Sequence, residues 1–273
     1  MEATVLQKEQ RQFFDDNGYL VVPGALTPEE VEGLTDASDH LIDDFEREQN
    51  QSYVQRRPGI VQEPAFHPLL AHPSTLPLLV QLLTPNIHLH TTAIIYKYPE
   101  TESEAPARGW HRDIGLTQDL GHAGTVRAGI KVGYCLTDFH QPNSGFTLFA
   151  PGSHRLLTPL PIPRGEVDPK IVTELRLSAG DAFLFENRIF HTTAPNLSPR
   201  LSKVMIFGYS YRWMGGRHSE MMQVRPGDDV LEQVDDIGKQ LLGGTSEALV
   251  EWAEAQGLAP PPFEWTTEVQ AGG

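Results

Sequence analysis

Cysteine is almost absent from this sequence: Cys135 is the only one among 273 residues. A single cysteine cannot form an intrachain disulfide, and it excludes zinc sites built from several thiolates. Cys135 lies within the apolar run Val132–Leu136, where we expect a small buried side chain rather than a reactive thiol. The sequence therefore excludes disulfide-stabilised scaffolds and zinc sites built from several thiolates.

Positive charge is also scarce, since 21 lysines and arginines stand against 36 aspartates and glutamates, which gives a net charge of −15. A nucleic-acid-binding surface needs the opposite sign, so no nucleic-acid partner is expected. No stretch approaches the roughly 18 consecutive apolar residues of a membrane span, and residues 1–11 are too polar for a secretory signal. We expect a soluble, cytoplasmic protein with no membrane partner.

The first 85 residues are predicted to be mainly helical and to flank the main part of the domain. Thr27-Pro28-Glu29-Glu30 is a capping box with proline at the first helical position, which predicts that a helix begins there. Residues 49–66 show no hydrophobic period and are expected to form a loop that could close over a site as a lid. The expected elements are a helix over 7–16, a strand over 19–22, a helix from 28 to about 47 and a short helix over 74–83.

After residue 86 the chain changes character and becomes rich in β-branched and aromatic residues. Short strands separated by Gly, Pro, Asn and Asp, without helices between them, indicate an antiparallel sandwich or barrel of the jelly-roll kind. We expect one mainly β (α+β) domain with a core over about 86–213, an N-terminal helical part over 1–85 and a helical C-terminal appendix over 214–273. The expected strands are 87–98, 126–138, 146–150, 172–177, 182–186 and 203–212, and the appendix helices are 230–242 and 246–255.

The segment Trp110-His111-Arg112-Asp113 carries the main chemical signal. On an extended strand His111 and Asp113 point to the same face, because side chains alternate with a period of two. An imidazole and a carboxylate need one further histidine to form the three-ligand set that holds non-haem Fe(II). Two later histidines compete for that place. We favour His191, which follows an alternating strand pattern, over His154, which follows a Pro-Gly turn.

With these residues the chain resembles the phytanoyl-CoA dioxygenase-like (PhyH) family of Fe(II)/2-oxoglutarate-dependent oxygenases, over roughly Phe13 to Trp213. No single motif is specific, but five occur in the family's order over about two hundred residues. The motifs are Phe13–Pro23, Ile95–Pro99, Trp110–Asp113, Asn143–Gly145 leading to Pro151–His154, and His191–Asn196 with Arg200.

The resemblance implies a double-stranded β-helix in which His111, Asp113 and His191 bind Fe(II), with 2-oxoglutarate as co-substrate and O2 as oxidant. The distal carboxylate of 2-oxoglutarate needs a cation, and arginine suits it because its planar fork binds a carboxylate bidentately. Arg200 is the nearest candidate. Many relatives place this arginine two residues later, where this chain has Ser202, so another cation could serve instead. Two threonines, Thr193 and Thr147, match hydroxyl residues that assist the co-substrate in relatives.

Substrate contacts are expected from the loops and strands around the ligand segment. Arg108, Arg112 and Ile114 flank the ligands directly. Other side chains could line the pocket, although core packing is the more common role for the aromatic ones: Tyr96, Lys97, Lys131 and Tyr134. The substrate itself is expected to be a small organic molecule.

The retained Asp113 favours oxygenation, because the halogenating relatives replace this carboxylate by a small residue. The resemblance implies decarboxylation of 2-oxoglutarate to succinate together with oxidation of a small molecule, such as a natural-product intermediate. Hydroxylation is the expected outcome. Cyclisation, desaturation or epimerisation by the same cofactor chemistry is the first alternative, and a jelly-roll binding protein without turnover is the second.

Overall fold

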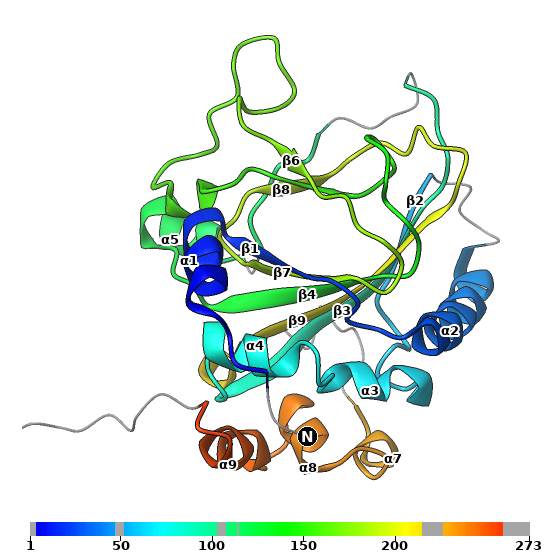
Figure 1. Cartoon of the computed structure of the whole chain (residues 1–273), viewed down its shortest axis with the longest axis vertical. Coiled ribbons are helices and arrows are strands. Elements are labelled where there is room, and N and C mark those ends of the chain that lie inside the picture. The colour runs from blue at the N-terminus through cyan, green and yellow to red at the C-terminus, as the bar shows by residue number, and fades with distance from the viewer. Residues whose placement is uncertain (1–3, 47–51, 103–107, 114, 215–225, 259–273) are drawn as a thin grey trace, which may run out of the picture.

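Two antiparallel β-sheets form the centre of the structure (Figure 1). The structure is a computed structural model that describes residues 4–46, 52–102, 108–113, 115–214 and 226–258. Within these residues the larger sheet has six strands in the order β1-β7-β4-β9-β3-β2, and the smaller has three in the order β6-β5-β8. The strands are β1 (Tyr19–Val22), β2 (Tyr53–Arg56), β3 (Ile87–Lys97), β4 (Gly129–Cys135), β5 (Thr147–Phe149), β6 (Thr173–Glu174), β7 (Ala182–Glu186), β8 (His191–Thr193) and β9 (Ser202–Tyr211).

Helices cover one face of the large sheet, and the small sheet lies over the other face (Figure 1). The described helices are α1 (Lys8–Asn17), α2 (Pro28–Glu46), α3 (His67–Leu70), α4 (Leu76–Leu82), α5 (Leu116–Gly124), α7 (Asp228–Leu231), α8 (Asp236–Leu241) and α9 (Ala248–Ala255). None of these described helices has the length and apolar character needed to cross a bilayer. This two-layer arrangement confirms the predicted jelly-roll class.

The alternation of side chains along the strands divides the interior into two apolar clusters. Between the sheets lies an aromatic cluster in which Phe183 contacts Phe146, Phe149 and Phe185, all of them buried. On the opposite face of the large sheet, alternate strand residues pack under the helices in a second cluster, which includes residues of α2, α4, α8 and α9. The sheet is therefore buried on both faces, and the space between the sheets is where a site can form.

The start of α2 and the end of α1 show the capping interactions that the sequence predicts. At the start of α2 the backbone N–H of Glu30 donates to Thr27 Oγ1 (3.2 Å), and the backbone N–H of Thr27 donates to Glu30 Oε2 (2.7 Å). This is the capping box that the sequence predicted. Helix α1 ends at Gly18, whose φ of 85° lies in the left-handed region that glycine adopts without strain.

Three segments differ from the sequence-based expectation. The loop expected over 49–66 contains strand β2, which the polar residues Gln55 and Arg56 concealed, because its register comes from pairing with β3 rather than from its own pattern. The segment 115–126 contains helix α5, and the appendix helix expected over 230–242 is two short helices, α7 and α8. Pairing with β3 decides the structure of β2, and α7 and α8 each bury a side chain in the cluster under the helices.

The N-terminal part contributes to the large sheet as well as flanking it. Strand β1 pairs with β7, and β2 pairs with β3, so both edges of the six-stranded sheet come from the first 85 residues. The proposed core over 86–213 thus lacks two of the strands of its own sheet. The division at residues 86 and 213 stays a prediction.

The aromatic cluster between the sheets gives the first testable prediction. Phe183→Ala should lower the free energy of unfolding by about 3–5 kcal/mol, the usual cost of truncating a buried phenylalanine, because Phe183 has no exposed surface. Urea unfolding followed by far-ultraviolet circular dichroism measures this. Phe13→Ala is the matched control, since Phe13 is 42% exposed. An equal loss in both variants would contradict the proposed packing.

Candidate metal centre

The segment that carries His111 is attached to the small sheet beside β8. His111 and His191 form an isolated antiparallel bridge in which the N–H of each donates to the carbonyl of the other, at 3.0 and 3.1 Å. Two residues later the N–H of Asp113 donates to the carbonyl of Asn187 (2.9 Å). These three backbone hydrogen bonds hold the segment in an extended form beside β8.

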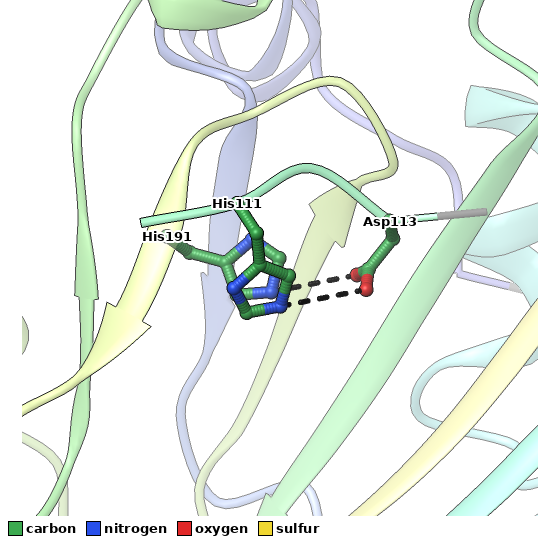
Figure 2. Close-up of side chains that lie close together, drawn as sticks. All are labelled: His111, Asp113 and His191. Carbon is green, nitrogen blue, oxygen red and sulfur yellow. Dashed lines mark ion pairs between the residues drawn. The ribbon is translucent and has the colours of Figure 1, made fainter. Parts of the chain in front are cut away.

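The bridge brings the three predicted ligands together (Figure 2). His111, Asp113 and His191 each offer one ligand atom, and these atoms all lie within 4.8 Å of one another. The Nε2 atom of His191 is 3.5 Å from Asp113 Oδ2, and the Nε2 atom of His111 is 3.9 Å from Asp113 Oδ1. His154, the competing candidate, lies elsewhere and contacts the carbonyl of Asp15 through Nε2 (3.0 Å).

The hydrogen bonds of the two imidazoles leave their Nε2 atoms turned towards Asp113. The Nδ1 atom of His111 contacts the carbonyl of Gly109 (2.7 Å), and Nδ1 of His191 contacts the carbonyl of Ile189 (3.1 Å). A carbonyl only accepts, so Nδ1 carries the proton in each ring and a neutral imidazole then has its lone pair on Nε2. This is the arrangement that metal-binding histidines usually show.

Burial and charge keep Asp113 and His191 in the protonation states that bind metal. Burial would raise the pKa of the Asp113 carboxyl, but the positive charge of Lys131 and its hydrogen bond outweigh this effect and hold the pKa well below its usual range. Burial lowers the pKa of His191 to about 4, although the charge of Asp113 opposes the shift. At neutral pH, Asp113 is therefore ionised and His191 is uncharged.

A lone pair of His191 consequently faces a lone pair of Asp113 with no proton between them. Asp113 Oδ2 is buried and has no hydrogen-bond partner among the described residues. Such an atom is costly to bury unless something else compensates it. A cation bound between Asp113 Oδ2 and the two Nε2 atoms would satisfy all three at once. The donor set, two imidazoles and one carboxylate, fits a non-haem iron site with open positions.

Lys131 is a member of the site whose role the sequence did not indicate. Its ammonium donates to Asp113 Oδ1 at 2.7 Å, from strand β4 on the opposite sheet. Sequence reasoning placed Lys131 only among side chains that could line the pocket. Its contact with Asp113 depends on how the two sheets face each other, which no local pattern encodes. Lys131 occupies one carboxylate oxygen and leaves the other for a metal.

Aromatic rings close the site towards the interior. The ring of His191 lies 4.9 Å from that of Phe185 and 6.4 Å from that of Phe149, while His111 is 55% exposed on its side chain. Asp113 and His191 are buried. The site is thus closed to solvent on the side of His191 and accessible to solvent on the side of His111.

The two predicted threonines lie opposite each other in the small sheet. Thr193 is in β8, two residues after His191, and Thr147 in β5 is its cross-strand partner. Both therefore share the face of His191. Arg200 is exposed in the loop between β8 and β9, where its carbonyl accepts from Asn196 Nδ2 (2.7 Å).

The residues predicted to contact substrate are distributed over several places. Arg108 pairs with Asp168 (3.1 Å), and Arg112, which points away from its neighbours His111 and Asp113, donates to the carbonyls of Ser153 and Leu156. Lys97 is buried in an ion pair with Glu100 (2.7 Å). Ile114 lies outside the described residues.

Tyr96 and Tyr134 face the opposite side of the large sheet from the site. The Tyr134 hydroxyl contacts Thr75 Oγ1 (2.7 Å), and the Tyr96 hydroxyl donates to Asp39. Both rings belong to the cluster under the helices. The reason is the period of two: neither Tyr96 and Lys97 nor Lys131 and Tyr134 can share a face of the sheet. The expectation that these two tyrosines line the pocket is corrected accordingly.

The phytanoyl-CoA dioxygenase (PhyH) family matches residues 14–205, well over half of the chain. An ectoine dioxygenase from Nocardia farcinica is 24% identical over 226 residues, which cover 71% of this chain and 74% of that protein.

Solved structures show the same fold. HygX from Streptomyces hygroscopicus, with nickel and 2-oxoglutarate bound, is 18% identical with a TM-score of 0.62, and the match covers 76% of this chain and 88% of HygX. The epimerase SnoN, in complex with Fe3+, alpha ketoglutarate and nogalamycin RO, is 18% identical with a TM-score of 0.57, covering 74% and 82%. A further HygX structure also contains hygromycin B.

The contact between Lys131 and Asp113 gives the second prediction. Lys131→Met should lower the free energy of unfolding of the metal-free protein by up to about 3–5 kcal/mol, because it leaves a buried carboxylate without its nearest cation. Added Ni(II) should raise the unfolding temperature more in the variant than in the original protein, since the ion supplies the missing positive charge. Differential scanning calorimetry with and without Ni(II) measures both effects.

Lys203→Met is the matched control. Lys203 also lies on a strand of the large sheet and pairs with an aspartate, Asp39, but that aspartate is 44% exposed. Its loss should cost no more than about 1 kcal/mol. The assigned role of Lys131 is wrong if Ni(II) stabilises the Lys131 variant no more than the Lys203 variant.

Proposed function

Because the chain belongs to the phytanoyl-CoA dioxygenase (PhyH) family, we propose that it is a non-haem Fe(II)/2-oxoglutarate-dependent dioxygenase that hydroxylates a small organic molecule. The observation that carries the proposal is the convergence of two imidazoles on one buried carboxylate, whose Oδ2 atom has no hydrogen-bond partner among the described residues. Natural-product intermediates are the proposed substrate class.

In this proposal His111, Asp113 and His191 hold the iron. The bound metal, with 2-oxoglutarate and O2, supplies oxidising chemistry and yields succinate and carbon dioxide. The chain's own residues position the metal ligands and exclude water. Gly109 and Ile189 orient the imidazoles through Nδ1, and Lys131 orients Asp113 through Oδ1. Phe149 and Phe185 keep water from the buried side of His191.

Substrate should approach from the side of His111, because that imidazole is exposed whereas the other two ligand side chains are not. The segment before His111 is itself fixed from this side, since Asp168 accepts from Arg108 Nε (3.1 Å) and from Trp110 Nε1 (3.0 Å). We assign Arg108 and Trp110 to the rim of the opening. Thr193 and Thr147 are proposed to contact 2-oxoglutarate.

Retention of the carboxylate at position 113 supports oxygenation rather than halogenation. The likeness to the epimerase SnoN supports a second candidate, in which the same cofactors epimerise, cyclise or desaturate the substrate. The two candidates differ in the mass of the product. Hydroxylation adds one oxygen atom to the substrate, whereas epimerisation leaves the mass unchanged and desaturation or oxidative cyclisation removes two hydrogens.

Purified protein with Fe(II), ascorbate and 2-oxoglutarate should form succinate when a panel of small molecules is added under air, and mass spectrometry of the stimulating compound should show one added oxygen. The panel should include ectoine, because one relative is an ectoine dioxygenase, and hygromycin B, which is bound in a structure of HygX. Absence of succinate with metal confirmed in the protein, across the whole panel, would leave the binding-protein alternative in place.

The fourth prediction concerns the ligands. Asp113→Ala should weaken Fe(II) binding by more than the roughly 10–100-fold that changes outside the ligand shell cost, because it removes the only anionic ligand. Anaerobic titration followed by metal analysis measures the affinity. His154→Ala is the control, since His154 is buried but bound to Asp15 instead. Loss of metal from the His154 variant alone would disprove the ligand set.

A further inference from the structure

The structure contains a candidate for the cation that binds the distal end of the co-substrate, and this inference rests on the proposed function. Arg200, the expected anchor, is exposed in a loop. Ser202, which stands where many relatives have the arginine, is buried and donates through its hydroxyl to the carbonyl of Ser144. Neither residue supplies a cation to the space between the sheets.

Three other cations of the described residues lie on the inner side of the large sheet, and two of them already have an acidic partner. Lys97 is paired with Glu100, and both side chains are almost fully buried. Lys131 is paired with Asp113. The third is Arg57, which is half-buried and has no carboxylate within 4.0 Å among the residues that the structure describes.

Within the described part of the chain, Arg57 donates only to neutral oxygens. Its Nη1 donates to Thr91 Oγ1 (2.6 Å), and its Nη2 donates to Gln55 Oε1 (3.2 Å). A guanidinium that is partly desolvated gains little from such partners compared with a carboxylate, which can accept two parallel charge-assisted hydrogen bonds. Arg57 is therefore equipped to receive an anion in place of Thr91 and Gln55.

The strand register places Arg57 on the same side of the sheet as the metal site. Thr91 in β3 is the partner of Gly208 in β9, and Gly208 is the partner of Lys131 in β4. Directly opposed residues share a face, so Thr91 and Lys131 both point to the space that Asp113 occupies. No side chain separates them at Gly208, where a Cβ atom would lie 2.5 Å from Thr91 Cγ2.

Tyr53 connects Arg57 with the strand that carries His191. Burial raises the pKa of the Tyr53 hydroxyl, and this rise is opposed by the charge of Arg57 and by a hydrogen bond with Thr193. Thr193 lies two residues beyond His191, a distance of about 6.6 Å along a strand, which is on the scale of the carbon chain of 2-oxoglutarate. Thr193 thus lies about one 2-oxoglutarate chain length from a metal ligand, and Tyr53 lies between Thr193 and Arg57.

We propose that Arg57, rather than Arg200, binds the distal carboxylate of 2-oxoglutarate, with the hydroxyls of Tyr53 and Thr193 beside it. The guanidinium exchanges its hydrogen bonds to Thr91 and Gln55 for two to the carboxylate. A carboxylate of the substrate would have the same chemistry. The experiment therefore separates the two sources by measuring co-substrate binding with no substrate present.

Calorimetric titration of the Ni(II)-loaded protein tests the proposal without turnover. Two ligands are compared: 2-oxoglutarate, and 2-oxopentanoate, which has the same carbon chain and metal-chelating end but no distal carboxylate. Arg57→Gln should weaken 2-oxoglutarate binding about 10- to 100-fold, the range for losing hydrogen bonds to a charged group. The affinity for 2-oxopentanoate should not change. Arg200→Gln is the matched control and should bind both ligands as the original protein does.

Three outcomes overturn the proposal. The first is a loss of 2-oxoglutarate affinity in the Arg200 variant and not in the Arg57 variant. The second is an equal loss of affinity for 2-oxoglutarate and 2-oxopentanoate in the Arg57 variant, which would mean that Arg57 has a structural role. The third is unchanged 2-oxoglutarate binding in that variant, which would leave a substrate carboxylate as the partner of Arg57.

Arg57→Lys is a second variant that controls for a folding defect, because it keeps the positive charge but not the bidentate fork of the guanidinium. Its affinity for 2-oxoglutarate should fall less than that of Arg57→Gln, and its affinity for 2-oxopentanoate should not change. Binding of Ni(II) itself should be equal in all variants. If the original protein binds Ni(II) but neither 2-oxo acid, the proposed function fails. If it binds 2-oxoglutarate and forms succinate while Arg57→Gln is unaffected, only the assignment of Arg57 fails.

Discussion

The reciprocal backbone pair between His111 and His191 is the constraint on which the site depends. Eighty residues separate these histidines in the chain, yet each donates its N–H to the carbonyl of the other. A directly opposed pair on neighbouring strands must place its side chains on one face, close together. Asp113 follows at the next residue on that face and is fixed by its own bond to Asn187. A slip of one residue would turn both His111 and Asp113 away from His191.

Electrostatics then determines what the converged side chains can bind. An ionised carboxylate in a buried place requires a cation, and Lys131 supplies one to a single oxygen only. The other oxygen faces Nε2 of His191, and Nε2 of His111 lies beside the same carboxylate. The Nδ1 proton of each imidazole is held by a backbone carbonyl, so both Nε2 atoms present lone pairs. Those lone pairs repel one another unless a positive ion lies between them. The same residues that give the site its geometry therefore also give it a preference for a divalent metal.

Local sequence patterns predicted those parts of the fold and site that local chemistry controls. The capping box of Thr27 and Glu30 and the alternation at His111 and Asp113 are properties of a few neighbouring residues, and both are present in the structure. Strand β2 was missed because its register is imposed by β3. The contact of Lys131 with Asp113 was missed because it joins two different sheets.

The placement of Tyr96 and Tyr134 shows that the sequence already held part of the information on which strand residues can face the pocket. The period of two forbids neighbouring strand residues from sharing a face, so a pocket that receives Lys97 cannot also receive Tyr96. The same reasoning applied to β4 selects Lys131 over Tyr134. Lys131 faces the small sheet, whereas Tyr134 faces the helices. What alternation cannot supply is which face belongs to the site. That choice comes from the pairing of β4 with β9 and β7 and from the position of the small sheet, and hence from contacts between residues far apart in the chain. The contact of Lys131 with Asp113 assigns the faces of β4, and the registers with β7 and β9 carry that assignment to the neighbouring strands.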